Sequence, residues 1–185
     1  MSDLIGGATF LVFYVYLVIP LAPIIYIFLK WRSYRDNSPP DPQLGMKVVL
    51  YYFKTLAYHA CLASLAAILY GVLKSGSDLI KGGLGILVSC GILYVVHGFL
   101  ILKLTNTGKF PLTARIYTAF NLIIVGLVGM ISFVITFTTL IAKDLEQIEL
   151  PLVCFVLYGI AWVFQTLLFC KPLTLKKRTP PTQGA

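Results

Sequence analysis

The sequence contains five long apolar runs separated by short polar segments. The runs cover approximately residues 7–29, 47–73, 82–102, 114–141 and 150–169. Each has roughly 20 residues or more, which is enough for an α-helix to cross a hydrocarbon core of about 30 Å. A membrane β-barrel would instead have short segments of alternating polarity. The runs therefore predict an all-α integral membrane bundle of five transmembrane helices.

The composition supports a location inside a membrane. Of the 185 residues, 58% are hydrophobic and 12% are charged, whereas a water-soluble domain has about 25% charged residues. A water-soluble globule of this size could not bury so many apolar side chains, so we expect a multi-pass membrane protein. The sequence does not specify which membrane. We expect one domain over residues 1–170, followed by a basic, proline-containing cytoplasmic tail at 171–185.

The basic residues are divided unequally between the two sets of connections. Because cytoplasmic loops of membrane proteins carry the excess of Lys and Arg, this asymmetry predicts an external N-terminus and a cytoplasmic C-terminus. The formal net charge of +8 is then placed to contact anionic lipid headgroups, and nucleic-acid binding is not expected. Eleven basic residues lie in the first connection, the third connection and the tail, against three in the other two connections. The larger set is Lys30, Arg32, Arg35, Lys47, Lys103, Lys109, Arg115, Lys171, Lys176, Lys177 and Arg178, and the smaller set is Lys74, Lys81 and Lys143.

The second run carries two polar residues that are unusual in a membrane span, Lys54 and His59. At about 100° per residue, Lys54 shares a face with Tyr58 and Ile68. We expect this bulky face to contact lipid, with the Lys54 side chain extending toward the headgroups. His59 lies near the bilayer midplane and is expected to face inward as a neutral, hydrogen-bonded histidine between helices.

The face of the second run opposite Lys54 consists of small residues, and His59 lies at its edge. Such residues allow the backbone of another helix to approach closely, so this face predicts helix packing. Its members are Ala60, Ala63, Ser64, Ala67 and Gly71. After this run, KSGSD and the pair Gly82–Gly83 predict a tight hairpin to the third run.

Three polar residues on different runs share a similar predicted depth. His97, Asn121 and Gln165 each fall roughly 7–12 Å from the cytoplasmic boundary, counted at about 1.5 Å per residue. Pro20 and Pro23 lie at a similar depth in the first run, where they leave backbone carbonyls without their usual helical partners. These positions predict a polar layer in the cytoplasmic half of the bundle.

The fourth run carries polar residues along one side. Such a side should face protein or a wet cavity and not lipid. Hydrogen bonding between helices and the lining of a hydrated pathway both remain open explanations. Apart from Asn121, the polar members of this side are Tyr117, Thr118, Ser132, Thr136 and Thr139.

Recognisable catalytic patterns are missing from the sequence. No Asp or Glu lies inside a run, so an acid–base pair or a carboxylate proton relay is not expected. The four cysteines form no CxxC pair, and no metal site is predicted. The two histidines, His59 and His97, lie on neighbouring antiparallel helices and leave bis-His haem b as an alternative. Their depths differ by roughly 8 Å, which argues against it.

Three classes of function follow from these patterns. The first is a small non-enzymatic structural or accessory subunit that packs against copies of itself or against partner membrane proteins. The second is a channel or transporter protomer whose pathway follows the polar side of the fourth helix. The third is a redox membrane protein that uses the histidines.

Overall fold

The computed structural model describes residues 21–35, 41–143 and 147–170, and the regular elements in these ranges are α-helices. The helices are α2 (Leu21–Arg35), α3 (Leu44–Leu73), α4 (Ser77–Leu104), α5 (Leu112–Ile141) and α6 (Glu149–Cys170). The all-α prediction is therefore confirmed. Most of the first predicted span, including Pro20, lies outside the described residues, as does the predicted tail at 171–185.

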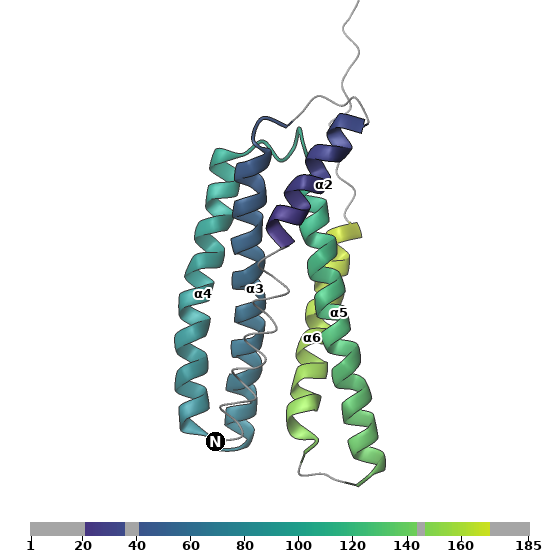
Figure 1. Cartoon of the computed structure of the whole chain (residues 1–185). Helices are drawn as coiled ribbons and strands as arrows, with labels where there is room; N and C mark the ends of the chain where they lie inside the picture. The colour runs from purple at the N-terminus through teal and green to yellow at the C-terminus, as the bar shows by residue number, and fades with distance from the viewer. Residues whose placement is uncertain (1–20, 36–40, 144–146, 171–185) are drawn as a thin grey trace, which may run out of the picture.

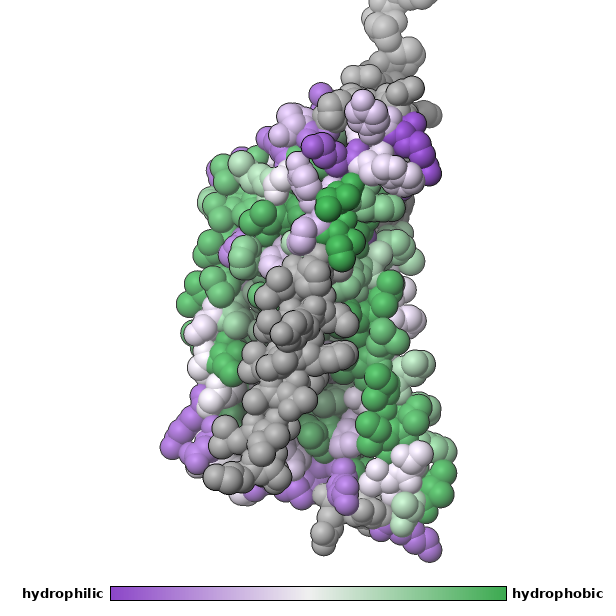
Figure 2. Space-filling model, viewed as in Figure 1, coloured by the Kyte–Doolittle hydropathy of each residue, from purple (hydrophilic) through white to green (hydrophobic). Residues whose placement is uncertain are grey.

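Four of the described helices, α3 to α6, are long and apolar enough to cross a membrane. The remaining predicted span, at residues 7–29, overlaps α2, whose 15 described residues are too few to test it. Figure 2 shows a broad apolar band over the middle of the molecule, with hydrophilic residues gathered at its two ends. This is the surface expected of a bundle surrounded by hydrocarbon. The predicted orientation stays a prediction.

The four long helices form two antiparallel hairpins that stand side by side (Figure 1). One hairpin is α3 with α4, and the other is α5 with α6. The hairpins meet because α3 lies against both α5 and α6. Helix α2 covers the seam between the two hairpins near one end. There its Ile25 and Leu29 pack against Val48 of α3 and Tyr117 of α5. We call this end, which carries residues 105–110, the loop end.

The turn between α3 and α4 lies in the predicted KSGSD segment but is shorter than predicted. The chain turns at residues 74–76, and α4 already begins at Ser77. Ser75 adopts a left-handed φ of 55°, and the Gly76 N–H donates to the carbonyl of Gly71 at 2.8 Å. This bond satisfies one of the last carbonyls of α3, with Ser75 in the left-handed position that glycine often occupies at a helix end. Gly82 and Gly83, which were predicted to form the turn, lie inside α4.

Gly83 serves close packing between the two helices. A Cβ atom at this position would lie 2.6 Å from Cγ1 of Ile68 and 3.0 Å from the carbonyl oxygen of Ser64. Because both distances are shorter than ordinary van der Waals contact, only glycine lets α3 and α4 come this close here.

The face of α3 that was predicted to meet lipid packs against α4 instead. Ile68 lies over Gly83, Tyr58 contacts the Tyr94 ring with centroids 6.2 Å apart, and Nζ of Lys54 lies 4.9 Å from the centroid of that ring. The prediction failed because the space for bulky side chains of α3 is supplied by glycines on the partner helix. Lys54 is therefore half-buried between two helices.

The predicted small-residue face of α3 is divided between different environments. Ser64 and Gly71 are buried, Ala60 and Ala67 are half-buried, and Ala63 is exposed. A Cβ atom at Gly71 would lie 3.0 Å from Cγ1 of Ile80 and 3.1 Å from Cβ of Leu79 on α4. Gly71 therefore packs closely against α4, whereas the exposed Ala63 does not contribute to a continuous packing surface of described residues.

Candidate functional site

A cluster of polar side chains lies in the seam between the two hairpins. His59 of α3 and Gln165 of α6 are 6% and 7% exposed. The side chain of Asn121 on α5 interacts with the His59 ring, and the hydroxyl of Tyr58 interacts with Gln165. We call His59, Asn121, Gln165 and Tyr58 the polar seam. It draws on α3, α5 and α6, because α3 lies against both helices of the second hairpin.

Two atoms of the polar seam are incompletely paired. Among the described residues, neither Nε2 of His59 nor Oδ1 of Asn121 has a hydrogen bond of standard geometry, although both atoms are buried. The two side chains are neighbours, so a small rotation could pair an Nε2–H donor with the Oδ1 acceptor. Unpaired polar atoms inside a protein are unusual, and each normally costs stability.

His97, the remaining member of the predicted polar layer, lies in another environment. Its ring is half-buried between α3 and α4, with its centroid 5.6 Å from that of Phe53. Its Nδ1 is 2.8 Å from the carbonyl oxygen of Leu93 and so donates a hydrogen bond within α4. Asn121 and Gln165 thus belong to the polar seam, and the histidine beside them is His59.

The hydroxyl groups along α5 are bonded to helix backbone. Thr118 donates to the carbonyl of Ala114 at 2.9 Å, and Thr136 donates to that of Ser132 at 2.7 Å. Thr139 donates to the carbonyl one turn back in the same way. Ser132 itself is buried at 8% exposure. These donors are used locally, so this side of α5 offers fewer free groups to a hydrated pathway than its sequence suggests.

Tyr117 extends this side of α5 to the loop end of the bundle. It is 1% exposed and donates from its hydroxyl to the carbonyl of Val48 at 3.0 Å. Its ring stacks on that of Tyr51, with centroids 5.8 Å apart. Tyr117 therefore fastens α5 to α3 and does not line an open path.

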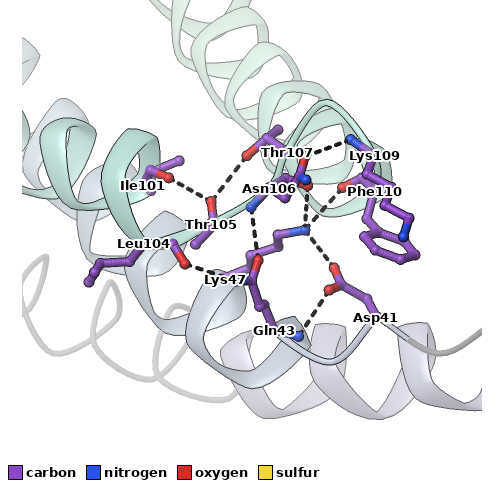
Figure 3. Close-up of polar contacts among 10 residues, drawn as sticks. All are labelled: Asp41, Gln43, Lys47, Ile101, Leu104, Thr105, Asn106, Thr107, Lys109 and Phe110. Atoms are coloured by element: carbon purple, nitrogen blue, oxygen red, sulfur yellow. Dashed lines mark hydrogen bonds and ion pairs between the residues drawn. The ribbon is translucent and has the colours of Figure 1, made fainter.

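A second polar cluster, which the sequence did not predict, joins two loops at the loop end. Its centre is Lys47, which is 0% exposed. Figure 3 shows its Nζ atom between the carboxylate of Asp41 and two backbone carbonyls. Nζ lies 2.7 Å from Oδ2 of Asp41 and donates to the carbonyl of Asn106 at 3.1 Å. It also lies 3.5 Å from the carbonyl oxygen of Phe110.

Gln43 completes this cluster from the same loop as Asp41. Its backbone N–H donates to Oδ1 of Asp41 at 3.0 Å. Its side-chain amide donates to the carbonyl of Leu104 at 3.1 Å and accepts from the N–H of Asn106 at 2.8 Å. We call Asp41, Gln43, Lys47 and residues 104–110 the lysine knot. Lys47 was counted among the basic residues of the first connection, but it lies in the first turn of α3 and is fully buried.

The two histidines do not fit a shared haem. His59 faces the polar seam with Asn121, whereas His97 faces Phe53 on the other side of α3. A bis-His haem needs both rings directed at one slot. Within the described residues, no group of three or more His, Cys, Asp or Glu side chains could hold a metal ion. The four cysteines are free thiols.

Together, the helices and the apolar surface define a helical bundle with four candidate transmembrane helices. Comparisons with known protein families, with characterised proteins and with solved structures give no match.

Proposed function

We propose that the protein is a non-enzymatic, multi-pass membrane protein that acts as an interaction or accessory subunit, with α4 as its contact helix. The single observation that carries this proposal is the one-sided packing of α4. Among the described helices, α4 lies substantially against α3 alone. Large apolar side chains such as Ile92 and Phe99, at 59% and 56% exposure, cover much of its other side.

The outward side of α4 also carries small residues at helical spacing. Gly82, Gly85 and Ser89 are three and four residues apart and so share one face. A Cβ atom added at Gly82 or Gly85 would meet nothing within 4 Å, whereas Gly83 lies on the side that faces α3 and is crowded by Ile68. Ser89 is exposed as well. Small residues on the free side of a membrane helix are typical of contacts with another helix.

The alternatives have less support. A pathway along α5 would need polar groups open to water, but Thr118, Thr136 and Thr139 donate to the backbone of α5. A redox role would need both histidines at one site, and His59 and His97 contact different residues. An accessory role requires neither feature.

A pair of glycine variants tests the proposal. Two differently tagged copies of the full chain are expressed together, and co-purification and complex size are measured in mild detergent. Gly85→Leu should strongly reduce co-purification, or should shrink the complex that the chain forms in native membranes. Gly91→Leu is the matched control, because a Cβ atom at Gly91 also meets nothing within 4 Å but points roughly 120° away around the helix.

Two results would contradict the proposal. In the first, the wild-type chain is monomeric in extracts of its native membranes. In the second, complex formation is unchanged by Gly85→Leu or is reduced equally by Gly91→Leu.

A further inference from the structure

Lys54 places a positive charge inside the apolar part of the α3–α4 hairpin. It is the eleventh residue of the 30-residue helix α3, so it lies about 15 Å along the helix from Leu44. With α3 centred in a hydrocarbon core of about 30 Å, this position is roughly 8 Å inside the nearer boundary. A charge at such a depth is costly and is normally paired, so an intramembrane lysine marks a candidate binding site.

The side chain of Lys54 turns toward α4, where its ammonium meets no negative charge. Nζ lies 4.9 Å from the centroid of the Tyr94 ring. It also lies beside Gly98, since a Cβ atom added to this glycine would be 3.8 Å from Nζ. Within the part of the chain that the structure describes, Nζ of Lys54 has no hydrogen bond and no ion pair. The ring contact therefore offsets only part of the cost of desolvating the ammonium.

The chain supplies no carboxylate that could pair with Lys54 at this depth. All seven Asp and Glu residues lie outside the five apolar runs of the sequence. A second copy of the chain has the same composition, so its transmembrane segments cannot provide the anion either. An anion that meets Lys54 inside the membrane would therefore belong to a different molecule.

The surface around Lys54 is open to such a molecule. Lys54 and Gly98 are half-buried, and Tyr94 is 37% exposed. Apart from Lys54, nothing lies within 4 Å of the Cβ position at Gly98, so the glycine leaves space next to the ammonium. The hydroxyl of Tyr94 forms no hydrogen bond with the described residues and adds a second donor. Gly98 points roughly 140° away from Gly85 around α4, so this surface is separate from the contact face described above.

We propose that Lys54, Tyr94 and Gly98 form a docking site for a transmembrane helix of another protein, and that this helix carries an Asp or Glu at the depth of Lys54. The ammonium pairs with the carboxylate, and the Tyr94 hydroxyl donates a second hydrogen bond to it. Gly98 allows the partner backbone to approach. The depth favours a carboxylate on a helix over a lipid headgroup, because headgroup phosphates lie outside the hydrocarbon core. The site goes beyond the contact role of α4, since it needs a partner chemically unlike this chain.

The test uses a leucine-rich, single-span peptide that carries one Asp about 8 Å inside the membrane boundary. The full chain and the peptide carry a fluorescence donor and acceptor, and energy transfer in phosphatidylcholine vesicles measures their association. A peptide with Asn at the same position is the reference, because Asn keeps the size and an acceptor oxygen but lacks the charge. The wild-type chain should bind the Asp peptide about tenfold more tightly, since charge-assisted hydrogen bonds are about twice as strong as neutral ones.

Variants of the chain locate the effect. Lys54→Gln should abolish the preference for the Asp peptide, and Lys54→Arg should retain it because the cation is kept. Gly98→Leu keeps the charge but fills the space beside Nζ, so it should weaken binding of both peptides. Lys103→Gln is the matched control and should keep the preference, since Lys103 is an exposed lysine of the same hairpin whose Nζ lies over the Phe99 ring.

Three results would overturn the proposal. They are equal binding of the two peptides to the wild-type chain, a preserved preference in a Lys54→Gln chain of native helicity, and equal losses in Lys54→Gln and Lys103→Gln. A further arm replaces part of the phosphatidylcholine by phosphatidylglycerol. Loss of the preference in these vesicles would mean that a lipid headgroup occupies the site and would overturn the assignment to a helix, whereas a retained preference supports it. Because none of these measurements involves Gly85, their outcome is independent of the contact role of α4.

Discussion

The lysine knot and the polar seam both bury polar groups inside an apolar molecule, but they treat these groups differently. In the knot, the ammonium of Lys47 meets a carboxylate and two backbone carbonyls. In the seam, Nε2 of His59 and Oδ1 of Asn121 lack hydrogen bonds of standard geometry among the described residues. The knot joins two loops at one end, whereas the seam lies where the two hairpins meet.

This difference indicates which cluster holds the fold together. Removing one partner of a buried ion pair strongly destabilises a protein, because the other charge is left buried and uncompensated. A cluster with spare donors and acceptors contributes less to stability and tolerates changes of its members. We therefore expect stability to depend on the knot, and the seam to tolerate a relative movement of the hairpins.

The largest expected effect concerns Lys47. Lys47→Met retains most of the volume but leaves the Asp41 carboxylate without its partner, so we expect a loss of about 3–5 kcal/mol in the free energy of unfolding. Unfolding of the purified chain in bicelles, followed by circular dichroism on titration with SDS, measures this loss. Lys54→Met is the matched control, because Lys54 is only half-buried and has a ring contact with Tyr94. A similar loss in both variants would show that the knot has no special role.

A smaller effect is expected at Gln43. Its side chain bridges the carbonyl of Leu104 and the N–H of Asn106, and each such hydrogen bond contributes about 1 kcal/mol. Gln43→Ala should therefore lower the free energy of unfolding by about 1–2 kcal/mol in the same titration. Gln43→Glu keeps the acceptor for the Asn106 N–H and should retain part of the stability. If Gln43→Ala has no effect, the two loops are held by Lys47 alone.

The long helices were predictable because a continuous apolar run of this length has few alternatives in a membrane. The run near residues 114–141 corresponds to α5 at Leu112–Ile141. The start of α4 was misplaced because a glycine pair is typical of turns as well as of close helix packing. Only the structure distinguishes the two, through the contact of Gly83 with Ile68.

The clusters were predictable only in part. Asn121 and Gln165 stood out because each is polar within an apolar run. The choice of His97 over His59 failed because depth along a helix does not tell which neighbour the helix faces. The sequence does not reveal that α3, and not α4, lies against the second hairpin. The burial of Lys47 was not predicted, because a lysine at the start of an apolar run is typical of a loop charge. Only the structure shows that Asp41, six residues earlier, lies beside it.

The smallest expected effect lies in the polar seam and sharpens its contrast with the knot. Asn121→Leu removes a buried, unpaired acceptor and fills its space with apolar atoms, so the lost interaction with His59 is offset by relief of desolvation. We expect the free energy of unfolding to change by no more than about 1 kcal/mol in the SDS titration. Asn121→Ala is the comparison variant, because it also removes the acceptor but leaves a void, and it should be the less stable of the two. A loss above about 2 kcal/mol in Asn121→Leu would mean that the His59–Asn121 pair is fully hydrogen-bonded, as the partners of Lys47 are, and the distinction between seam and knot would fail.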